Sequence, residues 1–228
     1  MGAVKVAVVT GAAGALGSAV LDDLTGRGWT VAALDRPGDR LDEAGRRDGV
    51  VPVPVDLLDR ASVAAAFEQV DGVGTPTGLV ALAGGFRSSS LADLDEDLLE
   101  AMWSTNVTAL LWCAQAAAPR MAAAGGGSIV TVGSRSAVSG SAPVAYGASK
   151  AAVVRATEVL ADELRPHRIR VNCVLPSVID SPANRSWMSA ELAARAVPPS
   201  AIAPVIAFLL SAESAPVSGA RIPVYGDA

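Results

Sequence analysis

Short apolar runs alternate with helical segments along almost the whole chain of 228 residues. Seven runs have strand length and are apolar at nearly every position, which is typical of strands buried on both faces. They lie at residues 5–10, 30–34, 50–55, 79–83, 128–132, 170–175 and 219–225. Helical patterns lie between them, at about 16–26, 60–69, 94–122, 145–165 and 200–212. This alternation predicts a doubly wound Rossmann-type α/β fold, with a seven-stranded, mostly parallel sheet and helices on both faces.

Length and composition restrict the kind of protein. The length suits one α/β core, so we expect a single domain, 1–228, that also holds the site. The net charge of −5 and the scattered basic residues argue against a nucleic-acid partner. Two uncharged stretches imitate membrane spans, but 104–119 is too short and 196–212 contains three prolines. Cys113 and Cys173 lie in apolar surroundings, which predicts free thiols in a soluble, cytoplasmic protein.

Histidine chemistry is almost excluded. His167 is the only histidine and lies in a predicted loop. Serine-histidine triads, HExxH zinc sites and Cys/His metal clusters therefore lack their parts, and we expect no metal.

A glycine-rich turn follows the first predicted strand, in the run VAVVTGAAGALG at 6–17. Gly11 permits a tight turn, Gly17 permits close helix packing, and the free amides at the helix start can receive a pyrophosphate. Asp35 ends the second strand, and its separation from Gly17 is close to the roughly 20 residues expected for a carboxylate that binds ribose hydroxyls. These residues predict a dinucleotide site that prefers NAD(H). Arg36 leaves NADP(H) open, because it could meet a 2′-phosphate, although Asp35 would repel that group.

Tyr146 stands four residues before Lys150, in the run YGASK at the start of an Ala- and Val-rich helix. Positions i and i+4 share one helix face, so the ammonium can lie near the phenol. A nearby positive charge favours the phenolate, so we expect Lys150 to lower the pKa of Tyr146, which would then act as a general acid or base. The two residues alone leave an ordinary surface pair open.

Taken together, these motifs resemble the short-chain dehydrogenase/reductase family over essentially the whole chain. TGAAGALG is similar to the cofactor loop, with Ala15 in place of the usual central glycine, where we expect a tighter approach to the phosphates. Asn106 in STNVTAL and Ser134 in IVTVGS match the family's asparagine and catalytic serine. The spacing from Ser134 to Tyr146 is one residue shorter than usual, so Ser136 stays a weaker candidate.

The resemblance assigns roles to this set. It implies that Ser134 holds a carbonyl oxygen, that Tyr146 exchanges the proton, that Lys150 contacts the nicotinamide ribose, and that Asn106 supports a water-linked proton path. The segment at 171–182 resembles the one that clamps the nicotinamide, with Ser177 in place of a glycine, and ALAG at 81–84 departs from the usual NNAG. The implied cofactor contacts are Gly11, Ala13, Ala15, Leu16, Gly17, Asp35, Arg36, Asp56, Leu57, Ala83, Gly84, Tyr146, Lys150, Pro176, Ser177, Ile179 and Ser181.

The implied function is NAD(H)-dependent hydride transfer between nicotinamide and a small ketone or secondary alcohol. A homodimer or homotetramer would form through the helices at 94–122 and 145–165. Local similarity to dihydropteridine reductases, in AGGF and LPSVIDSPANR, leaves reduction of a ring imine as one alternative, and a non-catalytic nicotinamide sensor is another. The filled Asn106 and Ser134 positions favour a carbonyl substrate and an enzyme.

The region expected to cover the substrate, 182–197, contains two residues of interest. Arg185 could recognise an anionic substrate group, and Trp187 could contact substrate or simply pack. For Trp103 and Trp112, packing in the core or against another subunit is favoured.

Overall fold

Seven parallel strands form one sheet in the computed structural model, which describes residues 5–227. Their order is β3-β2-β1-β4-β5-β6-β7, so the order reverses between β1 and β4. The strands are β1 (Lys5–Thr10), β2 (Trp29–Asp35), β3 (Val50–Pro54), β4 (Pro76–Ala81), β5 (Gly127–Val132), β6 (Ile169–Pro176) and β7 (Arg221–Val224). The predicted doubly wound fold is confirmed, and every strand pair in this sheet is parallel.

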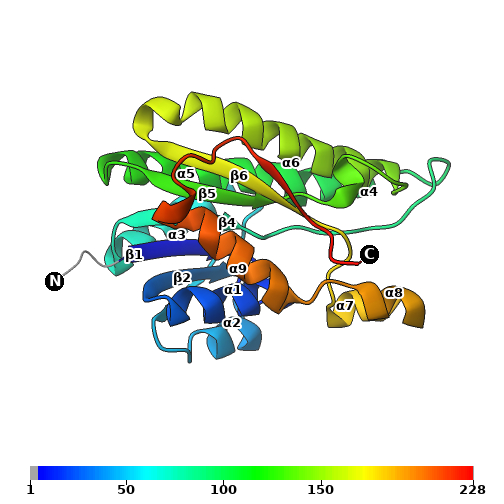
Figure 1. Ribbon diagram of the computed structural model, residues 1–228, viewed down its shortest axis with the longest axis horizontal. Helices are drawn as coiled ribbons and strands as arrows, with labels where there is room; N and C mark the ends of the chain where they lie inside the picture. Colours follow the sequence, from blue (N-terminus) through cyan, green and yellow to red (C-terminus); the bar gives the residue numbers. More distant parts are fainter. Residues whose placement is uncertain (1–4, 228) are drawn as a thin grey trace.

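Helices cover both faces of the sheet (Figure 1). One face carries α1 (Ala15–Gly26), α2 (Asp39–Ala44) and α9 (Pro199–Leu210), and the other carries α3 (Arg60–Val73), α5 (Ala109–Ala123) and α6 (Val144–Glu163). Successive side chains of a strand point to opposite faces, so Ala7 and Val9 pack with α1 and α9 while Val8 packs with α3 and α5. This explains the continuous apolar runs of the five central strands, which are buried on both sides, whereas the edge strands β3 and β7 are partly exposed.

Shorter elements gather near the carboxyl ends of the strands (Figure 1). They are α4 (Glu96–Trp103), the π-helical turn η1 (Ser104–Thr108), the 3₁₀ turn η2 (Arg135–Ala137), α7 (Pro182–Arg185) and α8 (Ala190–Arg195). Two further 3₁₀ turns, η3 (Arg165–His167) and η4 (Ala212–Ser214), connect the later elements. Helices α2, α7 and α8 were not predicted, because elements of four to six residues show no measurable helical periodicity.

Three predicted elements differ from the structure by more than two residues, and the first is the helix expected at 60–69, which is α3 and ends at Val73. The strand expected at 79–83 is β4, which begins at Pro76 and ends at Ala81. The Ala83 amide donates to the Thr10 hydroxyl, 3.2 Å away, so the chain has left the strand ladder there. The helix expected at 94–122 consists of α4 and α5, joined by the π-helical turn η1. One wide turn shifts the spacing of the apolar residues only slightly, so the sequence reads as a single helix.

Several expectations from composition can be compared with the described residues. Cys113 and Cys173 are free and buried, as predicted. Within residues 5–227, no helix has the length and apolar character needed to cross a bilayer. In that same part of the chain, no group of His, Cys, Asp and Glu side chains is arranged to hold a metal ion.

Candidate active site

The glycine-rich turn between β1 and α1 depends on residues without side chains. Gly11 has φ +66°, and a Cβ there would lie 2.9 Å from the backbone nitrogen of Ala83. A Cβ on Gly17 would lie 2.3 Å from the Gly11 carbonyl oxygen, so α1 packs directly on the turn. Gly14 precedes α1 and offers no side chain to its first amides. The start of α1 is therefore open to an anionic group, as the sequence predicted.

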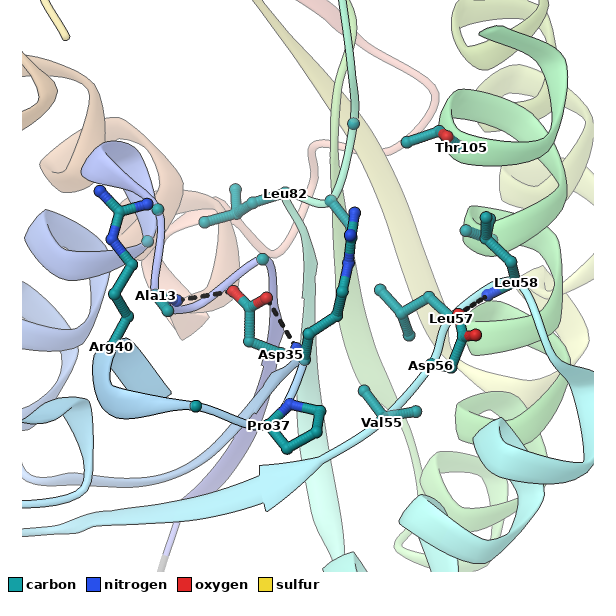
Figure 2. A pocket seen from close by; sticks show the side chains of 18 of the residues that line it. Ala13, Asp35, Pro37, Arg40, Val55, Asp56, Leu57, Leu58, Leu82 and Thr105 are labelled. Carbon is teal, nitrogen blue, oxygen red and sulfur yellow. Dashed lines mark hydrogen bonds between the residues drawn. The ribbon is translucent and has the colours of Figure 1, made fainter. Parts of the chain in front are cut away.

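A cavity of about 680 Å³ opens beside this turn, at the carboxyl ends of β1 to β4 where the strand order reverses (Figure 2). In doubly wound sheets this crevice is the usual ligand site. The predicted cofactor residues that line it are Gly11, Ala13, Leu16, Gly17, Asp35, Arg36, Asp56, Leu57, Ala83 and Gly84. Ala15, the first residue of α1, is exposed and is not among the lining residues.

The lining also includes residues that the sequence did not point out. They are Gly14, Pro37, Gly38, Asp39, Arg40, Val55, Leu58, Leu82, Thr105 and Ala109. Most of these are chain neighbours of predicted residues, so their sequence position could have indicated them. Thr105 and Ala109 come from the η1 region, whose bulge has no clear sequence signal.

Asp35 bridges the glycine-rich turn and the end of β2. Its Oδ2 accepts a hydrogen bond from the Ala13 amide at 2.9 Å (Figure 2), and its Oδ1 accepts one from the Arg36 amide at 2.8 Å. Each carboxylate oxygen has a second lone pair, so both can still accept from a hydroxyl. The guanidinium groups of Arg36 and Arg40 belong to exposed residues on the same wall. Asp35 therefore orders the turn and also presents an anionic acceptor to the cavity.

Asn106 is buried in the wide turn η1 and fixed by three hydrogen bonds. Its Oδ1 accepts from the Gly85 amide at 2.8 Å, and its Nδ2 donates to the Gly85 carbonyl at 3.2 Å and to the Ser149 hydroxyl at 2.9 Å. The Ser149 hydroxyl in turn donates to the Tyr146 carbonyl at 2.9 Å. Asn106 thus ties the loop after β4 to the start of α6.

Gly84 lies in a narrow space beside this network. A Cβ at Gly84 would be 2.9 Å from Asn106 Oδ1 and 3.2 Å from Lys150 Nζ. The predicted residues Asn106, Lys150 and Gly84 are therefore brought together. The absence of a side chain leaves room at this point of the cavity wall.

The side chains of Ser134 and Tyr146, which the sequence predicted to act together, lie beside each other. Ser134 is buried just beyond β5, and its hydroxyl hydrogen-bonds the Tyr146 phenol. The Ser136 amide donates to Ser134 Oγ at 3.2 Å, which holds that side chain in place. The hydroxyl beside the phenol is therefore that of Ser134.

The pKa of Tyr146 moves opposite to the predicted direction. Burial raises the pKa of the phenol, and the hydrogen bond with Ser134 only partly opposes this. Lys150 Nζ donates to the Val132 carbonyl at 2.9 Å, and burial lowers the pKa of Lys150 to about 8. The expectation that Lys150 lowers the phenol pKa is wrong for this structure, because removal from water dominates both groups.

Besides Ala15, six predicted cofactor residues do not line the 680 Å³ cavity: Tyr146 and Lys150 on α6, and Pro176, Ser177, Ile179 and Ser181 at and after the end of β6. Pro176 ends β6, and the Ser177 hydroxyl donates to the Tyr225 carbonyl at 2.7 Å. Ile179 forms a parallel bridge with Val197, and the Ser181 hydroxyl caps α7 by accepting from the Asn184 amide. These contacts hold the segment after β6 against Tyr225, against Val197 and at the start of α7.

Arg185 does not present a free charge to a substrate. Its guanidinium pairs with the Asp180 carboxylate through two hydrogen bonds, the second 2.7 Å long, and the pair lowers the pKa of Asp180. Trp112 packs against the core, as favoured from the sequence, whereas Trp103 is exposed.

Phe86 is a site residue whose role the sequence did not reveal. Its ring meets the Tyr146 ring edge to face, with centroids 4.9 Å apart. Its other neighbour is Trp187, whose ring is stacked at 6.1 Å. The run AGGF places Phe86 directly after the glycines that follow β4, and that position was its only signal.

The residues present fit a nicotinamide dinucleotide. The cavity joins an open helix start, which suits a pyrophosphate, to a carboxylate that suits ribose hydroxyls. Its wall at Gly84 adjoins Lys150, in the helix that also carries Tyr146. The geometry therefore joins a dinucleotide cavity to a hydroxyl pair suited to proton exchange with a carbonyl or alcohol.

Comparison with known proteins agrees with this geometry. Residues 5–192 match the protein family described as short chain dehydrogenase. Galactitol 2-dehydrogenase of Rhizobium johnstonii is 32% identical in an alignment 240 positions long, which covers 96% of this chain and 92% of that protein. The NAD-dependent glycerol dehydrogenase of Listeria innocua is 34% identical over 182 residues, covering 77% of this chain and 70% of that protein.

Solved structures extend the agreement to the fold. A short-chain type dehydrogenase/reductase from Mycobacterium ulcerans superposes with a TM-score of 0.91 at 27% identity, over 98% of this chain and 89% of that one. The chain therefore belongs to the short-chain dehydrogenase/reductase family and is an oxidoreductase of alcohols and ketones that uses a nicotinamide cofactor.

Proposed function

We propose that this enzyme is NAD(H)-dependent and that Tyr146 is the general acid and base for a ketone or secondary alcohol. The observation that carries the proposal is the hydrogen-bonded pair of the Ser134 hydroxyl, just beyond β5, and the Tyr146 phenol on α6, the helix that also brings Lys150 to Gly84 in the cavity wall. A nicotinamide cofactor held in this cavity would supply the hydride in reduction and receive it in oxidation. The protein must then hold the oxygen and move one proton.

Ser134 and Tyr146 divide this work in the proposed mechanism. In ketone reduction the Ser134 hydroxyl donates a hydrogen bond to the carbonyl oxygen, and the Tyr146 phenol donates the proton to the same oxygen. In alcohol oxidation Tyr146 accepts that proton. Proton transfer from a positioned side chain contributes about 10²–10⁴-fold to rate. The raised pKa of Tyr146 keeps the phenol protonated at neutral pH, which suits the reduction direction.

Lys150 and Asn106 position these groups. Lys150 is held at the Val132 carbonyl, close to Gly84, where its ammonium can meet the hydroxyls of the nicotinamide ribose. Asn106 fixes the Gly85 backbone and, through Ser149, the first turn of α6. We propose that the water-linked proton path passes beside this anchored asparagine.

Asp35 supports a preference for NAD(H) over NADP(H). Its carboxylate lines the cavity and can accept from both adenosine ribose hydroxyls, whereas a 2′-phosphate would remove one donor and add a like charge. One relative is described as NAD-dependent. We expect NADH to bind more tightly than NADPH when both dissociation constants are measured at one ionic strength. Equal affinities, or tighter binding of NADPH, would indicate that Arg36 and not Asp35 decides recognition at the adenosine ribose, and would contradict the preference.

The experiment that tests the reaction follows NADH absorbance with a panel of ketones, quinones, acyl thioesters and quinonoid dihydropterin. We expect turnover of ketones. Turnover of dihydropterin alone would instead favour reduction of a ring imine, and no turnover of any compound would contradict the proposed chemistry.

A further inference from the structure

Three aromatic rings form a continuous surface that starts at the reactive phenol. Phe86 contacts Tyr146 edge to face at 4.9 Å and Trp187 in a stacked arrangement at 6.1 Å, with 24° between the two ring planes. Phe86 comes from the loop after β4, and Trp187 from the turn between α7 and α8. We call Phe86 and Trp187 the aromatic wall.

The aromatic wall is unusually open to solvent for such large rings. Phe86 is 48% exposed and Trp187 is 52% exposed, although Phe86 contacts two aromatic rings and Trp187 contacts one. Leaving this apolar area in water is unfavourable, and exposed rings beside a reactive group are typical of a surface that a ligand covers. The wall therefore offers exposed ring area that is continuous, through Phe86, with the ring of Tyr146.

Polar side chains around Trp187 are already engaged within their own segment. The side-chain amide of Asn184 donates through Nδ2 to the Ile179 carbonyl at 2.8 Å, and the Ser186 hydroxyl donates to the Ala183 carbonyl at 2.7 Å. Arg185 is paired with Asp180. These bonds stay within the segment, so what the wall itself offers to a substrate is ring surface, which favours an aromatic group over hydroxyl groups.

We propose that the substrate carries a flat aromatic ring next to its carbonyl or carbinol carbon, and that Phe86 and Trp187 select it by stacking. This inference rests on the proposed function, because it places the ring relative to the oxygen bound by Tyr146. It names the substrate class as aryl ketones and aryl carbinols, in preference to open-chain polyols.

The test compares three ketones with NADH: acetophenone, cyclohexyl methyl ketone and acetone. The variants are Trp187→Ala and Phe86→Leu, the second of which keeps an apolar side chain but removes the ring. Comparing each variant with wild type on the same ketone cancels the intrinsic reactivity of that ketone. Stacking pairs change rates by about fivefold to tenfold.

We expect kcat/KM for acetophenone to fall about fivefold to tenfold in both variants, with a smaller fall for cyclohexyl methyl ketone and less than twofold for acetone. Trp187→Phe should restore most of the acetophenone rate. Wild type should also oxidise 1-phenylethanol with a higher kcat/KM than galactitol or glycerol. Phe208→Leu is the matched control for Phe86→Leu, because Phe208 is 40% exposed on α9, and it should change none of the three rates.

Equal losses for all three ketones would show that the wall only supports Tyr146, and would overturn the inference while leaving the proposed function intact. Unchanged rates, or faster oxidation of polyols than of 1-phenylethanol, would overturn it in the same way. Failure of wild type to reduce any of the three ketones would count against the proposed function as well.

Discussion

Lys150 is a cation almost completely removed from water, and this shapes the site at the scale of single residues. It is 7% exposed, and its ammonium has one backbone acceptor, the Val132 carbonyl. Burial penalises the charged form, so the pKa of Lys150 falls to about 8. The pKa of the neighbouring Tyr146 phenol is raised by burial and is not lowered by Lys150. A ligand that offers further acceptors to this ammonium would recover part of the lost hydration.

The depressed pKa of Lys150 has a measurable effect on stability. The folded pKa of about 8 lies below the ordinary 10.5, so between these values the unfolded chain binds more protons than the folded one. The contribution of Lys150 to the free energy of unfolding therefore rises with pH across this window, by about 3 kcal/mol at most. Denaturant unfolding of wild type and Lys150→Met, without cofactor, measures it as a difference that grows with pH.

If the difference in unfolding free energy between wild type and Lys150→Met stayed flat from pH 8 to 10.5, the Lys150 ammonium would be well solvated, which would contradict this account.

Residue types with a fixed role were predictable from the sequence, and their environments were not. Asp35 was placed correctly in the cavity wall, because a carboxylate at a strand end needs only the chain order to be located. The pKa of Tyr146 was predicted in the wrong direction, since helix spacing says nothing about desolvation. Phe86 was noticed only as part of a motif, because its contacts with Tyr146 and Trp187 join segments far apart in the chain.

At the scale of elements, the turn between β1 and α1 was predicted well and the η1 region was not. The turn requires glycine at Gly11 and Gly17, and those requirements are visible as letters in the sequence. The π-helical turn around Asn106 joins α4 to α5 while the backbone stays helical, so the sequence has no proline or glycine there to indicate it. What fixes it is a set of side-chain bonds to Gly85 and Ser149, which only the folded chain brings together.

Gly17 should tolerate no side chain. In Gly17→Ala the new Cβ would lie 2.3 Å from the Gly11 carbonyl and 2.5 Å from the Ala12 carbonyl, so the turn or α1 must move. We expect a loss of about 1–3 kcal/mol in the free energy of unfolding, together with weakened NADH binding. Denaturant unfolding and NADH titration measure the two effects.

Gly26, at the end of the same helix, is the matched control. A Cβ there meets nothing within 4 Å, so Gly26→Ala should be neutral or slightly stabilising and should leave NADH binding unchanged. Similar behaviour of the two variants would show that close packing at Gly17 does not hold the turn.

At the scale of the whole molecule, α5 and α6 leave an apolar surface uncovered. A second cavity of about 460 Å³ lies along them, with Leu111, Ala118 and Leu160 among its lining residues. Leu111 is 40% exposed, and Val159 on α6 is 45% exposed. Because a self-complementary helix face can pair about a two-fold axis, we propose that a homodimer or homotetramer forms through these helices.

A charge on this surface should separate the subunits. We expect Leu111→Glu to lower the molar mass measured by light scattering after size exclusion, because burying an unpaired carboxylate in an interface is costly. Val51→Glu, on the edge strand β3, places the same charge at a similarly exposed apolar residue and should leave the mass unchanged. A monomeric wild type, or an assembly whose mass Leu111→Glu does not change, would contradict the proposal that the subunits meet through α5 and α6.

The role of Tyr146 is tested most directly by removing its hydroxyl alone. Tyr146→Phe keeps the ring that packs on Phe86 and removes the group that exchanges the proton. With the best ketone and saturating NADH, we expect turnover to fall by about two to four orders of magnitude while the NADH dissociation constant stays within a few-fold of wild type. Tyr225→Phe, at the chain's other tyrosine, should retain turnover. Near-normal turnover in Tyr146→Phe would contradict its assignment as the general acid and base.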